Sequence, residues 1–202
     1  MRVKAPKSKR QRRSAQPDAG ERAIPASGTN STARASTPDA QAFRDALSSC
    51  ASGVTIVTTL CDGEPHGLTV SAFCSVSAAP PRVLVCLGND TDSKPMIERS
   101  GSFAVNVLGV AGAALGPRFA KLASHVGDLF AGLETTRAES GSPILADSVV
   151  WLDCRVDAQY AVGDHTIFVG AVTALGRGRD ASEPVVYCRR TWRRLDPRPI
   201  DP

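Results

Sequence analysis

The stretch from Gly67 to Ser77 carries the residue types best suited to ligand binding. It reads GLTVSAFCSVS, so small and hydroxyl-bearing side chains alternate through a strand-like run before Pro80 and Pro81 turn the chain. Small residues let a ligand approach the backbone, and Ser and Thr hydroxyls with exposed amides donate hydrogen bonds to a phosphate or to the polar edge of a planar ring. Taken alone, the stretch is more typical of an edge strand with its polar face outward.

A second segment, Asn89 to Lys94, reads NDTDSK and leads into a predicted helix over Asp92–Arg99. A helix N-terminus favours anions, so Ser93 and Lys94 could hold a phosphate, with further positive charge from Arg99. A solvated loop lysine is the commoner structural interpretation of Lys94.

A third segment places His165 between a turn at Gly163-Asp164 and a long apolar strand. A histidine at such a junction could line a cleft. A structural histidine that is hydrogen-bonded to Asp164 would show the same pattern. His66 and His125 lie in loop-like surroundings, and we assign them no role.

Several familiar site motifs are absent from the sequence. It contains no G-x-x-x-x-G-K-[ST], no G-x-G-x-x-G that opens a helix after a strand and no G-x-S-x-G, so P-loop, Rossmann and hydrolase sites have no support. The six cysteines form no C-x-x-C pair and the histidines no H-x-x-x-H pair, so we expect no metal site. The cysteines are interpreted as small buried hydrophobic residues in a reducing cytosol.

Short apolar and β-branched runs indicate the elements that position these residues. The runs are Val54–Leu60, Gly67–Phe73, Arg82–Leu87, Phe103–Leu108, Val149–Asp157 and His165–Leu175. Six such runs suggest a barrel, and the Asp62-Gly63 dipeptide predicts a hairpin between the first two. Helical composition over Asp92–Arg99 and Ala111–Leu122 adds a few short helices.

Length and composition predict one domain with a tail at each end. The chain has 202 residues, of which 42% are hydrophobic and 22% charged. Residues 1–38 form a basic Ser/Ala/Pro-rich segment that we expect to be disordered, residues 39–197 the folded domain and residues 198–202 a C-terminal tail. Thr37-Pro38-Asp39 predicts a helix start with proline at the first helical position, and Phe43, Ala46, Leu47 and Cys50 then recur at helical spacing.

Charge and hydropathy indicate a cytoplasmic protein without nucleic acid or membrane partners. Residues 1–40 carry nine Lys/Arg against three Asp/Glu, whereas the rest of the chain is nearly neutral. No apolar run reaches the roughly 20 residues of a membrane span, and none resembles a signal peptide. The body has 5% aromatic residues and no basic patch interleaved with them, so nucleic-acid binding rests on the tail alone.

Taken in order, these pieces resemble the short-chain flavin reductase family. The resemblance covers about Phe43 to Leu195. It rests on Gly53–Thr58, Gly67–Ser77 with Pro80-Pro81, Ser100–Leu108, Phe119-Ala120, Gly163–Gly170, Val186-Tyr187 and Trp192. Members of this family fold as flavin-binding split β-barrels of Greek-key type and serve flavin-dependent monooxygenases and halogenases.

The resemblance implies a role for each candidate residue. The isoalloxazine ring and ribityl chain of FAD or FMN would lie against Thr69, Val70, Ser71, Ala72, Phe73, Cys74, Ser75 and Ser77. The phosphate end would meet Ser93, Lys94 and Arg99. His165 would face the nicotinamide of NADH or NADPH as the catalytic residue. Tyr187 and Trp192 would close the edge of the pocket or contact the dinucleotide.

The function that the resemblance implies is hydride transfer from NADH or NADPH to an exchangeable flavin that then diffuses to a monooxygenase or halogenase partner. The flavin supplies the electron-accepting chemistry, so the protein needs no conspicuous acid–base pair. A flavin-binding electron carrier or sensor without NAD(P)H turnover is the alternative. A homodimer is expected, because alternating apolar strands outnumber the helices that could cover them.

Overall fold

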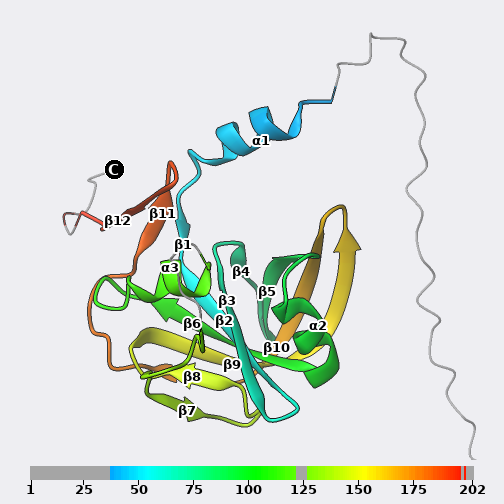
Figure 1. Ribbon diagram of the computed structural model, residues 1–202, viewed down its shortest axis with the longest axis vertical. Helices are drawn as coiled ribbons and strands as arrows, with labels where there is room; N and C mark the ends of the chain where they lie inside the picture. The colour runs from blue at the N-terminus through cyan, green and yellow to red at the C-terminus, as the bar shows by residue number, and fades with distance from the viewer. Residues whose placement is uncertain (1–36, 122–126, 197, 199–202) are drawn as a thin grey trace, which may run out of the picture. The chain divides into compact units, whose positions relative to one another are not determined.

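The computed structural model describes residues 37–121, 127–196 and 198, and β-strands dominate it (Figure 1). The helices are α1 (Ala40–Leu47), α2 (Ser93–Ser100) and α3 (Leu115–Phe119). The strands are β1 (Ser52–Gly53), β2 (Thr55–Cys61), β3 (Glu64–Val70), β4 (Phe73–Ala78), β5 (Pro81–Gly88), β6 (Ser102–Leu108), β7 (Thr135–Arg137), β8 (Pro143–Leu145), β9 (Ser148–Val162), β10 (His165–Arg177), β11 (Val186–Cys188) and β12 (Thr191–Arg193). The predicted fold class, mainly β with a few short helices, is confirmed.

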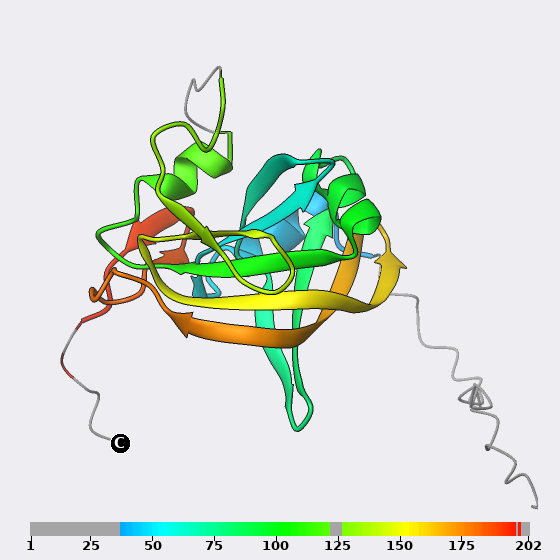
Figure 2. The ribbon, with the colours of Figure 1, turned by 90° about the horizontal axis from the view of Figure 1, so that it is seen from below.

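Seven strands form one antiparallel sheet in the order β3-β2-β6-β9-β10-β5-β4. Its two edge strands, β3 and β4, are consecutive in the sequence, and Ser71-Ala72 carries the chain from one edge to the other. Because β3 also approaches β5, the sheet curls into a barrel whose two edge strands do not pair with each other. Figure 2 shows this curvature in the long strands β9 and β10.

The hairpin predicted at Asp62-Gly63 is confirmed. β2 and β3 pair in register up to Cys61 and Glu64, and both turn residues have positive φ, 53° at Asp62 and 85° at Gly63. A two-residue turn of this type matches the twist of the flanking strands and selects Asp-Gly. The turn therefore fixes the register of β3, which later forms the floor of the candidate site.

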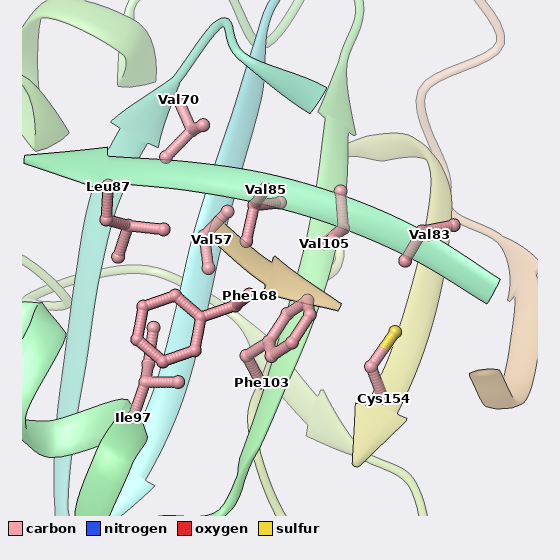
Figure 3. Packing of buried hydrophobic residues seen from close by; sticks show 10 residues of the cluster. All are labelled: Val57, Val70, Val83, Val85, Leu87, Ile97, Phe103, Val105, Cys154 and Phe168. Atoms are coloured by element: carbon pink, nitrogen blue, oxygen red, sulfur yellow. The ribbon is translucent and has the colours of Figure 1, made fainter. Parts of the chain in front are cut away.

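The barrel interior holds one hydrophobic cluster, which we call the barrel cluster. Its buried members are Val57, Val70, Val83, Val85, Leu87, Ile97, Phe103, Val105, Cys154 and Phe168. Figure 3 shows the rings of Phe103 and Phe168 at the centre of this group. A Cβ on Gly170 would lie 2.5 Å from the Phe103 ring, so packing there leaves no room for a larger residue.

A second cluster, which we call the wall cluster, lies on the other face of β2. Its buried members are Val54, Ile56, Leu108, Phe119, Leu145 and Val185, with Tyr187 and Trp192 among the partly buried residues packed against them. Neighbouring strand residues point to opposite faces, so Ile56 enters the wall cluster while Val57 enters the barrel cluster. Coverage on both faces explains why β2 is buried almost throughout.

The prediction of one strand over Gly67–Phe73 is wrong about where that strand ends. β3 stops at Val70, which pairs with Thr55 of β2, and β4 starts at Phe73, which pairs with Val85 of β5. Ser71 and Ala72 are exposed between these strands. The break leaves no signal in the sequence because neither crossing residue is Gly or Pro, the types that usually mark a turn.

The predicted helix Ala111–Leu122 is also too long. Only Leu115–Phe119 is helical among its described residues, and Leu122 lies outside them. The carboxylate of Asp180 accepts the Gly112 N–H at 3.3 Å, which holds the preceding residues in turns. By contrast β9 and β10 extend beyond the predicted runs, because the turn at Gly163 joins them into one long hairpin.

The first helix begins later than predicted. Asp39, not Thr37, is its N-cap, and Asp39 Oδ1 accepts the amides of Gln41 and Ala42, each at 2.8 Å. An aspartate carboxylate that accepts two free amides is a strong cap, so Pro38 lies outside the helix. Phe43 and Leu47 are exposed, and the described residues bury no part of α1.

The cysteines are only partly as expected. Cys61 and Cys154 are buried, Cys86 and Cys188 are intermediate, and Cys50 and Cys74 are exposed, so the buried interpretation is wrong for the last two. All six are free thiols. In the described ranges, no helix has the length and apolar character to cross a bilayer. The predicted tails, apart from residues 37, 38 and 198, lie outside the described residues, as does His125.

Candidate active site

A cleft of three adjoining cavities runs along β3. The aromatic end, about 160 Å³, is lined by Val54, Thr69, Ser71, Ala120, Tyr187 and Trp192. The central cavity, about 310 Å³, is lined by residues 67–69, 90–93 and 119–121. The outer end, about 200 Å³, is lined by residues 65–67, Asp92, Ser93, Lys121 and residues 128–130. Thr69 borders the first two cavities and Gly67 the last two, so the cavities adjoin one another along the strand.

One wall of the cleft is α3, which lies unusually close to β3. The Thr69 hydroxyl donates to the Gly116 carbonyl at 2.6 Å. A Cβ on Gly67 would lie 2.8 Å from the Phe119 ring, and one on Gly116 would lie 1.9 Å from the Trp192 ring. Glycine at these two positions is what lets strand, helix and indole come together.

The opposite wall is the loop between β5 and α2, and Asn89 fastens it to the β9–β10 turn. The backbone N–H of Asn89 donates to the Asp164 carbonyl at 2.9 Å, and the side-chain Nδ2 donates to the Gly163 carbonyl at 3.3 Å. Its Oδ1 accepts the Thr166 hydroxyl at 2.8 Å. These three hydrogen bonds of Asn89 hold the loop that presents residues 90–92 to the cleft.

An ion pair connects the two walls across the central cavity. Lys121 Nζ, just after α3, contacts Asp92 Oδ2, just before α2. The hydrogen bond and the charge of Lys121 hold the pKa of Asp92 below its ordinary value, and His66 adds a smaller effect in the same direction. The charged groups of the cleft are thus gathered away from its aromatic end.

Five of the predicted residues lie around this cleft. They are Thr69, Ser71, Ser93, Tyr187 and Trp192. Tyr187 and Trp192 are paired across β11 and β12, with ring centroids 5.7 Å apart in an edge-to-face arrangement. Ser93 is the first residue of α2 and only 5% exposed. The structure therefore brings together residues that lie more than a hundred positions apart.

Four further predicted residues, next to Ser71, lie away from the cleft. Val70 is buried in the barrel cluster and Phe73 packs against it. Ser75 and Ser77 line a separate groove of about 320 Å³ with apolar residues of β9 and β10. These side chains are separated from the cleft because successive residues of β4 point to opposite faces and because the exposed Ser71-Ala72 segment carries the chain between the two edge strands. Sequence spacing alone does not show this separation.

The exposed residues Ala72 and Cys74, and the two cations proposed for the phosphate, also lie outside the cleft lining. Lys94 Nζ pairs with Glu98 at 2.7 Å, one helical turn later, and Arg99 pairs with Asp62 of the β2–β3 turn. Both cations are therefore engaged elsewhere in this structure.

His165 lies beside the cleft rather than in its lining. It is the first residue of β10, and its Nδ1 is 2.7 Å from Asp164 Oδ1, a hydrogen bond that lowers the pKa of Asp164. A Cβ on Gly88 would lie 4.0 Å from His165 Nε2 and 2.9 Å from Asp90 Oδ1. The imidazole thus borders the same loop that lines the central cavity, from the side of the β9–β10 turn.

Sequence reasoning missed Asp92 and Lys121. Asp92 lies in the candidate segment Asn89–Lys94, but the sequence favours its neighbours Ser93 and Lys94 as the phosphate-binding residues. Lys121 directly follows Phe119-Ala120, one of the motifs of the family resemblance, and this adjacency was the available signal. Nothing local in the sequence indicates that Lys121 faces Asp92.

The cleft fits a flavin. Gly67, Thr69 and Ser71 line it along β3, and Ser71 donates its backbone amide to no other described residue, so this N–H group is available to a ring edge. The aromatic end suits a planar ring, and Ser93 and Lys121 at the other end suit a phosphate. In the described ranges, no cluster of side chains could hold a metal ion.

Comparison with known proteins shows the family to which the chain belongs. A family model described as a flavin reductase like domain matches residues 47–196. A flavin reductase (NADH) of Kitasatospora aureofaciens is 44% identical over 160 residues, covering 77% of this chain and 82% of that protein. A solved nitrilotriacetate monooxygenase component B homolog from Mycobacterium thermoresistibile has a TM-score of 0.74 and 32% identity, covering 80% of this chain and 89% of that chain.

A second solved structure is an NADH:FAD oxidoreductase of Streptomyces globisporus in complex with NAD and FAD fragments. It has a TM-score of 0.71 and 34% identity, and the match covers 79% of this chain and 94% of that chain. The family match spans the whole barrel and both walls of the cleft. The chain belongs to the flavin reductase like domain family.

Proposed function

We propose that this chain is an NADH-dependent flavin reductase that reduces exchangeable FMN or FAD and releases it to a flavin-dependent monooxygenase or halogenase. The observation that carries the proposal is the row of adjoining cavities along β3, with small residues on its floor, an aromatic end and a charged end that contains Lys121. The relatives that act on flavins with NADH support it. The monooxygenase component among the solved relatives supports the kind of partner.

In this proposal the isoalloxazine ring lies at the aromatic end. The backbone amide of Ser71 donates to its polar edge, and Tyr187 and Trp192 bound it on the outside. The ribityl chain follows β3 past Thr69 and Gly67. The phosphate then lies beside Ser93, at the N-terminus of α2, where the helix dipole favours an anion.

The bound flavin supplies the electron-accepting chemistry: a hydride passes from nicotinamide C4 to flavin N5, NADH becomes NAD⁺ and a solvent proton completes the reduced flavin. The protein orients the two rings and excludes water between them. His165, whose Nδ1 is held by Asp164, orients the nicotinamide from the loop side of the cleft. No nucleophile on the protein is required.

The test is NADH oxidation by the purified full-length chain. With added FMN or FAD, we expect NADH absorbance to fall catalytically, and without flavin we expect no turnover. NADPH should be a poorer donor. A tightly bound yellow chromophore that NADH does not reduce would instead indicate a flavin carrier or sensor and would overturn the proposal.

We also propose a homodimer. Val76 is 52% exposed and Leu175 is 65% exposed, and both line the apolar groove that contains Ser75. Figure 2 shows the β4–β5 hairpin extending from the barrel next to this region. A second copy of the chain that covers the groove would remove these side chains from water. Light scattering at micromolar concentration should give twice the chain mass, and a compact monomer would contradict the proposal.

The same chemistry supports a cytoplasmic location, because NADH is supplied inside the cell and the reduced flavin must reach a partner before it meets oxygen. All six thiols are free, as a reducing compartment keeps them. Cell fractionation with an antibody to the chain tests this location.

A further inference from the structure

The Asp92–Lys121 ion pair lies where a ligand in the cleft can reach it. It crosses the cleft, since both residues line the central cavity and the outer end. Its side chains are also accessible, with Lys121 60% and Asp92 74% exposed. An exposed ion pair contributes little to stability, so a stronger anion in the cleft can displace the carboxylate from the ammonium.

Asp92 also fails to do what its position predicts. It is the N-cap residue of α2, and an aspartate there normally accepts amides of the first helical turn. Its side chain makes no such cap hydrogen bond, whereas Asp39 caps α1 with two. The carboxylate turns instead to Lys121 across the cleft, so the N-terminus of α2 lacks the negative partner that this residue type usually supplies.

The backbone conformation fixes the position from which the Lys121 side chain extends into the cleft. It follows α3 with φ of 55°, and its amide donates to the Arg118 carbonyl at 3.2 Å, which ends the helix. α3 is in turn held to β3 by the Thr69 hydrogen bond to Gly116. The ammonium therefore starts from a fixed point on the cleft wall.

We propose that Asp92 is an exchangeable substitute for the flavin phosphate: it holds Lys121 across the cleft and yields that ammonium to the 5′-phosphate of FMN or FAD. This inference rests on the proposed function, because it requires a flavin in the cleft. Lys121 then raises the affinity for phosphorylated flavins over riboflavin, and Asp92 lowers it. Asp92 does so by competing for Lys121 and by repelling the phosphate.

The different linings of the two cleft ends indicate which part of the flavin binds at each end. The proposed role of Lys121 depends on this orientation of the flavin. The aromatic end contains no charged residue in its lining, whereas Lys121, His66 and the carboxylates Asp92 and Asp128 lie at the other end. Five residues of β3 and its continuation, Gly67 to Ser71, separate the two ends, and a strand rises about 3.3 Å per residue. That span suits a ring at one end and a phosphate at the other.

A reductase that must release its product gains from such an arrangement. The phosphate provides specificity at Lys121, while the nearby carboxylate limits the affinity that this contact yields. When the reduced flavin leaves, Asp92 takes the ammonium again, so the cationic group is not left without a partner.

The test compares FMN with riboflavin, which lacks the phosphate. Binding of each oxidised flavin to the full-length chain is followed by the quenching of flavin fluorescence, without NADH. Asp92→Asn should tighten FMN binding about three- to fivefold and leave riboflavin binding unchanged. Lys121→Gln should weaken FMN binding by a similar factor, again without an effect on riboflavin.

The matched control is Asp62→Asn. It removes the same charge from an exposed ion pair, the one with Arg99, that lies outside the cleft lining. It should leave the ratio of the FMN and riboflavin dissociation constants unchanged, which separates the local effect from that of net charge. In the Lys121→Gln background, Asp92→Asn should tighten FMN binding less than it does in the wild-type chain, because only repulsion is then relieved.

An unchanged or smaller preference for FMN over riboflavin in Asp92→Asn would overturn the inference while leaving the proposed function intact, provided that both flavins bind and are reduced. An equal gain in affinity for FMN and riboflavin would also overturn it, since the effect would then not depend on the phosphate. Failure of the wild-type chain to bind either flavin would instead overturn the proposed function itself.

Discussion

The barrel cluster and the wall cluster share strand β2, yet they are built in different ways. The barrel cluster is formed by residues of paired strands together with Ile97 of α2, and its side chains interlock around Phe103 and Phe168 (Figure 3). The wall cluster draws on short elements and connections, such as α3 and the small β1-β11-β12 sheet. One is held by continuous strand pairing, and the other by a few specific contacts.

This difference predicts that the barrel cluster mainly determines folding stability and that the wall cluster mainly affects ligand binding. The strand ladders hold the barrel cluster with many hydrogen bonds, so it can support most of the folding free energy. The wall cluster borders a cleft, and α3 depends on contacts such as Thr69 with Gly116 and Trp192 with Gly116. Changes in the barrel should therefore act on the whole fold, whereas changes in the wall should act first on the ligand.

The largest effect is expected from Phe168→Ala. Phe168 is fully buried at the centre of the barrel cluster, so the change should lower the free energy of unfolding by about 3–5 kcal/mol. Trp192→Ala is the matched change in the wall, and it should cost less because Trp192 is only partly buried. Urea unfolding followed by circular dichroism measures both, and an equal loss would show that the two clusters form one cooperative core.

The next effect concerns thiol reactivity within the barrel. Burial raises the pKa of the Cys154 thiol to about 12 from 9.0, so its thiolate fraction at pH 8 is lower by about a thousandfold. The exposed Cys74 should react with iodoacetamide at pH 8 while Cys154 does not. Peptide mass spectrometry after timed quenching measures both rates. Labelling of Cys154 as fast as Cys74 would mean that the barrel opens readily.

Flavin affinity should separate Ser71 from Ser75. Ser71→Trp places an indole in the aromatic end of the cleft, and we expect flavin affinity to fall by more than about tenfold, which corresponds to 1.4 kcal/mol. Ser75 lines the apolar groove instead, so Ser75→Trp should have the smaller effect on flavin and the larger one on dimerisation. Fluorescence titration and light scattering test the pair. Equal losses of affinity would place β4 in the flavin site, as the sequence prediction had it.

A smaller effect is expected from His165→Ala. If the imidazole orients the nicotinamide, losing one hydrogen bond of roughly 0.5–1.5 kcal/mol should raise the apparent KM for NADH about two- to tenfold. The affinity for oxidised flavin should stay nearly unchanged. Stopped-flow hydride transfer and flavin titration separate the two ligands. A loss confined to flavin binding would move His165 into the flavin site, and wild-type behaviour would make it a structural residue.

The smallest effect is expected from removal of the basic tail. A chain that begins at Pro38 should keep its NADH oxidation rate within about twofold, because residues 1–37 contain almost no large apolar side chain that could build part of a site. Steady-state assays with FMN compare it with the full-length chain. Loss of turnover in a folded truncated protein would show that the tail contributes to the site.

Much of the fold was predictable because its signals are local. The Asp62-Gly63 hairpin follows from turn chemistry, and the strand runs follow from apolar and β-branched composition. The errors lie where a distant residue competes with a local preference. Asp180 takes the Gly112 amide and shortens the predicted third helix, and the pairing of Val70 and Phe73 with different strands breaks the predicted run between them.

The sequence by itself determined which segments form the candidate site: the hydroxyl-rich stretch around Ser71, the segment before Ser93 and the turn before His165. Residue type and family resemblance carry that information along the chain. Only the tertiary structure decided which side chains in those segments meet. Curling of the sheet separates Ser71 from Ser75 at the edge-to-edge crossing, and the approach of α3 to β3 selects Lys121 rather than Lys94 as the cation of the cleft. These choices depend on contacts between residues far apart in the chain, and no local pattern encodes them.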